Sequence, residues 1–238
     1  MLHEGIYWIF DDEANVLQIK DGVEEISWKM IQEFSYGKDM YNYKEFEVIL
    51  PNTIREITTD AFSHVKLAKI IIPDSVVQIG ERAFFDAAYL KEVSISSEVY
   101  SIGSQTFAYC YNLRKVKILE GVKEIGILAF AGCRSLTKIV LPATIKYMSH
   151  DAFRYCDNLK ELYVPTVIYK NCKRSCENNY PNITAIPYEG SIDDILLDDS
   201  DNITEITNTN HASTDANNKS ISFNGVIRTN LIANKKKK

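Results

Sequence analysis

Residues 136–158 read LTKIVLPATIKYMSHDAFRYCDN, and residues 113–135 just before them read LRKVKILEGVKEIGILAFAGCRS. Aligned without a gap, the two segments share the consensus L-x-x-I-x-I-P-x-x-V-x-x-I-G-x-x-A-F-x-x-C, with aliphatic residues replacing one another. The phenylalanine of this unit recurs at intervals of 22, 23, 23 and 23 residues, at Phe62, Phe84, Phe107, Phe130 and Phe153. A fixed period of this length indicates one supersecondary unit copied in tandem, with a core that only stacked copies can build.

Each copy begins with apolar residues two positions apart, as at Val93 and Ile95. This alternation is typical of a short, half-buried strand, and a proline that ends the strand follows in four copies, at Pro51, Pro73, Pro142 and Pro165. Three copies carry a glycine after the second isoleucine, at Gly80, Gly103 and Gly126. These glycines predict a turn with a positive φ or a close backbone approach. The A-F-x-x-C stretch is too short for a stable helix and predicts a single turn.

The repeat resembles the BspA-type (Treponema pallidum type) leucine-rich repeat, most clearly in VVQIGERAF at residues 76–84 and in the I-x-I-P and C-x-x-L elements. The resemblance covers residues 44–165 well and the flanking segments weakly. It implies an α/β, β-rich solenoid: a right-handed superhelix with a parallel sheet on its concave side and short turns or 3-10 segments on the other. It also implies a binding or adhesion module, often at a microbial or protist surface, and not an enzyme.

The segments before and after the repeats form further regions of the chain. We expect an N-terminal cap and a divergent first repeat in residues 1–43, including a short helix or a longer excursion around Trp28, Met30, Ile31 and Phe34. Residues 166–188 predict a degenerate repeat that caps the C-terminal end. Residues 189–238 predict a disordered tail, because residues 189–218 hold eight carboxylates and no Lys or Arg and are rich in Asn, Ser and Thr. The Lys-rich end at 235–238 is either a solubilising end or a contact for an acidic membrane or a localisation signal.

Five cysteines fall into two sets. Cys110, Cys133 and Cys156 share one position of the repeat, which predicts small apolar side chains in the core. Cys172 and Cys176 form C-x-x-x-C in the degenerate last repeat. A zinc site would need further ligands, of which His150 is the nearest candidate. Three possibilities therefore remain open for these two cysteines: a metal site, a disulfide and two unreactive thiols.

Catalytic motifs are absent from the sequence. None of the four histidines, His3, His64, His150 and His211, lies in a nucleophile, zinc-protease or phosphate-loop motif. We therefore predict no enzyme activity, no catalytic residues and no bound cofactor or metal. The formal net charge of −5 gives no reason to expect nucleic-acid binding.

Location and assembly follow from what the sequence lacks. No apolar run approaches the roughly 18 residues of a membrane-spanning helix, and residues 1–5 lack the basic and apolar regions of a secretory signal. We therefore expect a cytoplasmic protein, with the cell surface as the alternative that the resemblance implies. The polar terminal repeats favour a monomer.

The positions between the buried strand positions should face solvent on the sheet. One column of such positions holds Ile49, Ile71, Ser94, Lys117, Val140 and Tyr163, and the neighbouring column holds Glu47, Lys69, Glu92, Lys115, Lys138 and Glu161. Charges of the second column mostly alternate in sign and could form a ladder of ion pairs. We predict a partner-binding face made of Ile49, Ile71, Lys115, Lys117, Lys138, Val140 and Tyr163.

A second candidate is Ile127-Leu128, which either contacts a partner or covers the neighbouring coil. Two functions are compatible with these surfaces. The first is a non-enzymatic module that presents its curved face to a protein partner, and the second is a BspA-like surface adhesin that binds host protein or matrix.

Overall fold

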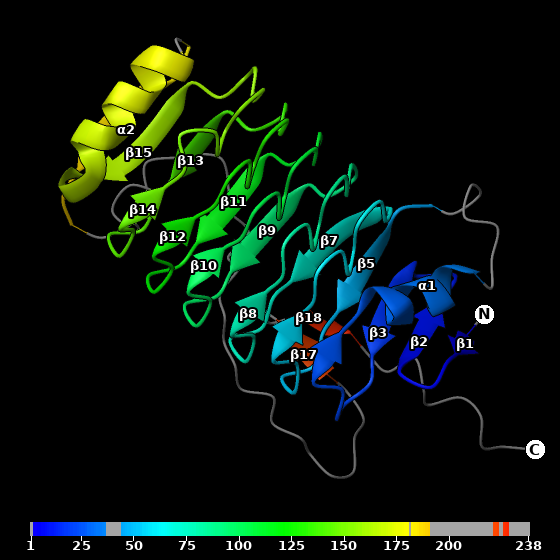
Figure 1. Ribbon diagram of the computed structural model, residues 1–238. Coiled ribbons are helices and arrows are strands. Elements are labelled where there is room, and N and C mark those ends of the chain that lie inside the picture. Colours follow the sequence, from blue (N-terminus) through cyan, green and yellow to red (C-terminus); the bar gives the residue numbers. More distant parts are fainter. Residues whose placement is uncertain (1, 37–43, 181, 191–220, 224–225, 229–238) are drawn as a thin grey trace, which may run out of the picture. The chain divides into compact units, whose positions relative to one another are not determined.

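The computed structural model describes residues 2–36, 44–180, 182–190, 221–223 and 226–228. The chain divides into two compact units, Met1–Leu197 and Asp198–Lys238. In the first unit the chain winds into coils, and successive coils place their strands side by side from β5 to β15 (Figure 1). The second unit contains an antiparallel pair, β17 (Ile221–Phe223) and β18 (Val226–Arg228). The predicted tail segment 191–220 and the end at 235–238 lie outside the described residues.

The main sheet takes one strand from each coil. Seven strands form its first part: β1 (Leu2–Glu4), β2 (Trp8–Asp11), β3 (Val16–Ile19), β5 (Phe46–Ile49), β7 (Leu67–Ile71), β9 (Glu92–Ile95) and β11 (Lys115–Ile118). A separate three-stranded sheet lies beside β11 and consists of β13 (Lys138–Val140), β15 (Glu161–Pro165) and β16 (Thr184–Tyr188); we call the two sheets together the main sheet. Pairing is antiparallel among the first three strands and parallel from β3 onward. Equivalent residues of the repeat lie opposite each other, as Val93 does Val116, so the predicted leucine-rich repeat solenoid is confirmed.

A second set of strands, each only two residues long, runs along another side of the coils. It consists of β4 (Glu25–Ile26), β6 (Glu56–Ile57), β8 (Gln78–Ile79), β10 (Ser101–Ile102), β12 (Glu124–Ile125) and β14 (Tyr147–Met148). These strands also pair in parallel between successive coils. They form two groups, β4-β6-β8 and β10-β12-β14, and within each group successive coils are hydrogen-bonded on this side as well as through the main sheet.

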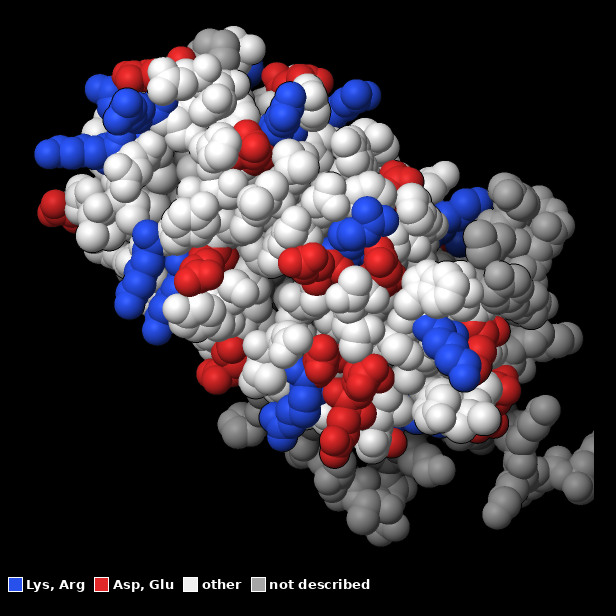
Figure 2. Space-filling view, in the orientation of Figure 1, with Lys and Arg blue, Asp and Glu red and all other residues white. Residues whose placement is uncertain are grey.

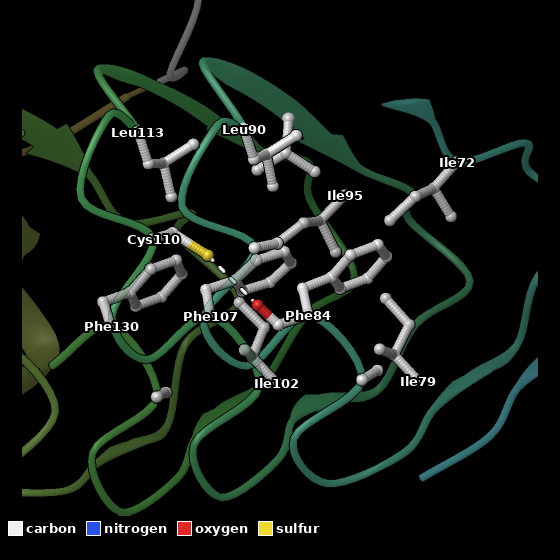
Figure 3. Close-up of a cluster of buried hydrophobic side chains, with 14 of the residues drawn as sticks. Ile72, Ile79, Phe84, Leu90, Ile95, Ile102, Phe107, Cys110, Leu113 and Phe130 are labelled. Carbon is white, nitrogen blue, oxygen red and sulfur yellow. Dashed lines mark hydrogen bonds between the residues drawn. The ribbon is translucent and has the colours of Figure 1, made fainter. Parts of the chain in front are cut away.

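The phenylalanine column forms a continuous stack inside the coils. Neighbouring ring centroids are 5.3, 5.0, 5.4 and 5.5 Å apart, and no interplanar angle exceeds 11°. All five rings are fully buried. Figure 3 shows the parallel rings of Phe84, Phe107 and Phe130 with aliphatic side chains such as Leu90, Ile95 and Ile102 around them. The period of the sequence thus becomes a column of packed aromatic rings.

The A-F segment of each coil forms a turn, as predicted, and also bonds to the next coil. The amides of Phe62, Phe84 and Phe107 donate to carbonyl oxygens one coil ahead, at 2.7, 2.9 and 2.8 Å. Residues on both sides of Phe62, Phe84 and Phe107 adopt positive φ although they are not glycine, for example Arg82 at 57°, and Leu128 before Phe130 does the same at 56°. Of the two roles expected for Gly80, the structure shows the close backbone approach, because a Cβ there would lie 2.4 Å from the Thr59 backbone nitrogen. Gly80 therefore permits a close approach of two coils.

Helices occupy both ends of the repeats. At the N-terminal end, α1 (Trp28–Tyr36) confirms the predicted short helix, and Phe34 packs against Trp8, Phe10 and Phe46 at 4.9–5.3 Å between ring centroids. At the C-terminal end, residues 166–179 form α2 (Thr166–Asn179), which the repeat pattern did not predict. Its buried side chains, Ile168, Cys172 and Cys176, are four residues apart and so lie on one face of the helix.

Two glycines at equivalent positions hold their coil to the next through a threonine. The Gly22 amide donates to Thr53 Oγ1 at 3.2 Å and the Gly121 amide to Thr144 Oγ1 at 2.9 Å. Both glycines have positive φ, 87° and 126°. Their surroundings differ, because a Cβ on Gly121 would lie 2.0 Å from the Ser97 carbonyl oxygen, whereas a Cβ on Gly22 would meet nothing within 4 Å.

We predict that Gly121→Ala destabilises the protein by about 3 kcal/mol or more, because it adds a backbone clash to the cost of a positive φ. The matched control Gly22→Ala should cost only about 1 kcal/mol, since it carries the conformational cost alone. Urea unfolding followed by circular dichroism measures both values. Equal losses for the two variants would contradict the clash at Gly121.

Two tyrosine hydroxyls fasten the C-terminal end to earlier coils. Tyr180 donates to the His150 carbonyl oxygen, and Tyr188 donates to the Leu141 carbonyl oxygen. Burial, and then the nearby Glu120 carboxylate, raise the pKa of Tyr188 to about 12. Burial also raises the pKa of Tyr180. Both hydroxyls therefore stay protonated, and able to donate, throughout the neutral range.

Since the folded-state pKa of Tyr188 lies above the unfolded value of about 10, its contribution to stability is fully present below pH 10 and is lost as the pH rises from 10 to 12. Tyr188→Phe should cost about 1 kcal/mol at pH 8, where the hydrogen bond is intact. The difference between the two proteins should shrink above pH 10. Chemical unfolding at several pH values tests this, and a constant difference from pH 8 to 12 would refute it.

Candidate functional site

The exposed face of the main sheet carries the predicted binding residues. The register places Lys115 opposite Glu92 and Lys117 opposite Ser94, while Lys138 lies opposite Glu161 and Val140 opposite Tyr163. Both columns are therefore aligned as the sequence predicted. Ile49, Ile71, Lys115, Lys117, Lys138 and Tyr163 are all half-buried.

Val140 is an exception, because only 5% of it is exposed. The prediction that it faces solvent was wrong, and the same holds for Ser94, which is 4% exposed. Tyr163 lies opposite Val140 in the register, and its ring, 4.8 Å from Lys138 Nζ, extends along the same face of the sheet. The large ring therefore shields the smaller side chain beside it. Val140 therefore offers little surface to a partner.

The charged column is aligned, but its ion pairs are weak. Lys115 Nζ lies 4.0 Å from Glu92 Oε1, and the same oxygen lies 3.5 Å from Arg114 Nη2. Two cations thus share one carboxylate. Lys117 forms no ion pair with any residue that the structure describes. The centre of the sheet consequently carries an excess of positive charge.

A surface of aromatic and arginine side chains lies at the turns that follow the phenylalanines. Phe85 and Tyr109 pack edge to face at 5.4 Å, and Tyr109 and Tyr111 are 6.0 Å apart. Arg82 lies 4.1 Å from the centre of the Phe85 ring, and Arg134 lies 5.3 Å from that of Tyr111. The sequence analysis missed this group because its members occupy different positions of successive repeats.

Ile127 and Leu128, the second predicted candidate, also lie at a turn. Ile127 is 56% exposed, and Leu128 is half-buried. The Ile127 carbonyl oxygen accepts a hydrogen bond from the Gln105 amide at 2.9 Å, so its backbone is part of the contact between coils. The Ile127 side chain remains available for a contact.

The cysteines are all free and buried. As predicted, Cys110, Cys133 and Cys156 lie in the core, and their thiols donate to the carbonyl oxygens of Phe84, Phe107 and Phe130 at 3.2, 3.2 and 3.0 Å. Figure 3 shows the bond from Cys110. Burial raises the pKa of the Cys110 and Cys133 thiols. The repeated cysteine therefore satisfies a buried carbonyl oxygen besides filling space.

Cys172 and Cys176 lie one helical turn apart on the buried face of α2 and form no disulfide. Burial is the main cause that raises the pKa of Cys172 to about 12 and that of Cys176 to about 11. Both are therefore protonated thiols near neutral pH, the form that is neither nucleophilic nor metal-binding. In the described ranges, no three His, Cys, Asp or Glu side chains are placed to hold a metal ion. Of the alternatives left open by the sequence, this geometry favours unreactive thiols.

Two histidines lie on the surface beside carboxylates, as expected for loop residues. His64 Nδ1 is 2.8 Å from Asp86 Oδ2, and His150 Nε2 is 3.4 Å from Asp151 Oδ2. Their side chains are 60% and 70% exposed. A catalytic His-Asp pair would present its second ring nitrogen to a nucleophile, but His64 Nε2 has no hydrogen-bond partner in the described part of the chain. The pair is better explained as a contact between neighbouring coils.

Figure 2 shows charged side chains as small groups of both signs, separated by uncharged surface. Within the described ranges, none of the helices has both the length and the apolar character needed to cross a membrane.

Comparison with known families identifies the repeat. The family described as the BspA type leucine rich repeat region matches residues 30–160 and 77–204, in six copies. No curated protein matches the chain. Together the two matched ranges span well over half of the 238 residues.

Solved structures share the fold at low sequence identity. A leucine rich repeat protein of T. pallidum is 21% identical, with 76% of this chain and 79% of that chain covered and a TM-score of 0.53. The pneumococcal vaccine antigen PcpA is 20% identical, with 71% and 51% covered and a TM-score of 0.51. A leucine-rich repeat protein of Eubacterium ventriosum is 22% identical, with 79% and 45% covered and a TM-score of 0.51. The match spans about half of each of the last two chains.

Proposed function

Because the chain belongs to the BspA-type leucine-rich repeat family, we propose that it is a non-enzymatic protein-binding module that presents the exposed face of the main sheet to a protein partner. The observation that carries the proposal is the uncompensated positive charge at the centre of this face. Lys117 has no carboxylate partner in the described chain, and Lys115 shares Glu92 with Arg114.

The two lysines reinforce each other. They are two residues apart on β11 and so project from the same face, with their Cα atoms roughly 6–7 Å apart. Both side chains are half-buried, so their aliphatic stems lie along the sheet while the ammonium groups reach solvent. Carboxylates of a partner would relieve the repulsion between these ammonium groups.

Apolar side chains extend the same face on either side of the lysines. Ile49 and Ile71 lie toward the N-terminal end, and Tyr163 lies toward the C-terminal end. Rigid aromatic and aliphatic side chains beside charged groups are typical of protein interfaces. The proposed partner surface is therefore acidic at its centre and apolar at its margins.

We predict that Lys115→Glu combined with Lys117→Glu lowers recovery of the specific partner about tenfold or more, which corresponds to about 1.4 kcal/mol of binding free energy. Tagged proteins captured from the source cells and quantified by mass spectrometry provide the measurement. Lys146→Glu combined with Lys170→Glu is the matched control, because both lysines are exposed and lie outside this face.

The control should capture partners as the unaltered protein does, and circular dichroism should show the same fold in all three proteins. If every captured protein is recovered equally with the Lys115 and Lys117 variant, the main sheet is not the binding face.

A second candidate function is that of a cell-surface adhesin that binds host protein or matrix. The observations that favour it are the family membership and the likeness to PcpA, which is described as a vaccine antigen. The first candidate instead works inside the cell, where the binding face would meet a cytoplasmic partner.

Protease treatment of intact source cells distinguishes a module inside the cell from an adhesin at the cell surface. If the adhesin proposal holds, immunoblotting should show loss of the protein while a cytoplasmic marker survives. Complete protection of the protein, followed by its digestion after lysis, would exclude the adhesin.

A further inference from the structure

The N-terminal cap has an apolar surface that a solenoid end does not need. Terminal caps are expected to be polar on their outer side, because they shield the last coil from solvent. Here Ile6 is 77% exposed, Tyr7 is 44% exposed and Trp28 is 47% exposed. Three large apolar side chains in one cap indicate a surface that a partner covers.

Ile6 and Tyr7, but not Trp28, line a hollow of about 700 Å³. Its wall consists of the β1–β2 turn, the segment between β3 and β4, and the first turns of α1. The apolar side chains that line it are Ile6, Tyr7, Val23 and Met30. The hollow is therefore large enough for several side chains of a peptide, and part of its wall is apolar.

The turn that carries Ile6 and Tyr7 is held in place although its side chains are exposed. The Gly5 amide donates to the Trp8 carbonyl oxygen at 2.9 Å, and the Lys20 amide donates to the Tyr7 carbonyl oxygen at 2.9 Å. A Cβ on Gly5 would lie 2.4 Å from Trp8 Cε2, so only glycine lets the turn pack on the indole. Trp8 is itself packed edge to face on Phe34 of α1, at 5.3 Å. The apolar edge of the hollow is thus preorganised, which lowers the entropic cost of binding.

The charge of the hollow is negative. Asp21, Glu24, Glu25 and Glu33 line it, and none of them forms an ion pair with a described residue. Of the two lysines in the lining, Lys20 is already engaged, because its Nζ lies 2.7 Å from Glu4 Oε1 and 2.8 Å from the Gly5 carbonyl oxygen. Only Lys29 remains to offset the four carboxylates. A ligand that fits must therefore bring positive charge as well as an apolar group.

We propose that this hollow binds a cationic segment of a partner protein, in which Lys or Arg residues flank an aliphatic or aromatic side chain. The apolar side chain packs against Ile6 and Tyr7, and the cations pair with Glu24, Glu25 and Glu33. The site lies at the N-terminal cap and has the opposite charge to the lysine-bearing face of the main sheet, so the two surfaces select different partners.

The test is selection of random 12-residue peptides, displayed on phage, against the full-length immobilised protein. We expect the enriched peptides to be net positive and to contain an aliphatic or aromatic residue. Synthetic copies of them, measured by fluorescence polarisation, should bind more weakly as salt concentration rises, because the ion pairs are exposed.

Variants then locate the binding site. Glu24→Gln, Glu25→Gln and Glu33→Gln combined should weaken peptide binding about tenfold or more, and Ile6→Ser alone should also weaken it about tenfold. The matched control combines Glu81→Gln, Glu98→Gln and Glu124→Gln, which remove as many carboxylates outside the hollow and should leave affinity unchanged.

Enrichment of neutral or acidic peptides only, equal binding to the hollow variants, or no enrichment over an empty surface would each overturn the proposal. The unfolding temperature of every variant should equal that of the unaltered protein, which shows that a loss of binding is not caused by a loss of fold. None of these outcomes depends on the main-sheet face, so the two proposals can fail separately.

Discussion

The rest of the structure depends on one constraint, the distance between neighbouring coils. Hydrogen bonding between parallel strands fixes this distance near 4.8 Å, and the stacked phenylalanine rings, with centroids 5.0–5.5 Å apart, accept the same spacing. Because the strands and the stacked rings require nearly the same spacing, an aromatic side chain can recur at one position in five successive coils. A coil that departed from this spacing would lose both the ring contacts and the ladder of hydrogen bonds.

The same constraint explains how much the sequence could predict. Buried positions recur with the coil, so the strands, the phenylalanine stack and the cysteine column could all be read from the period. The residues with a left-handed backbone conformation could not be predicted from the sequence. The coil spacing imposes this conformation on residues as different as Asp60, Arg82 and Leu128. Beside the phenylalanines, glycine marks this conformation at Gly132 alone, and at the other positions hydrogen bonds between neighbouring coils offset its local cost.

The structure departs from the sequence prediction where a neighbouring side chain or a different period overrides the repeat. Val140 has the alternation of an exposed residue but lies beside Tyr163, whose size the pattern does not take into account. The 22 residues from Pro165 to Pro187 continue the spacing of the repeat, yet Ile168, Cys172 and Cys176 follow the period of a helix. That second period was the available signal for α2. The N-terminal hollow had no such signal, because its lining comes from separate segments between Ile6 and Glu33.

Function in such a fold must come from residues that the coil spacing leaves free to vary. The spacing places every exposed side chain about 4.8 Å from its counterparts in the next coils, so a substitution in one repeat changes a local pattern without moving the backbone. Lys117 occupies a position filled elsewhere by isoleucine, serine, valine and tyrosine. One such replacement is enough to set a positive charge at the centre of the sheet, while the cap, outside the repeat, is free to carry the opposite charge.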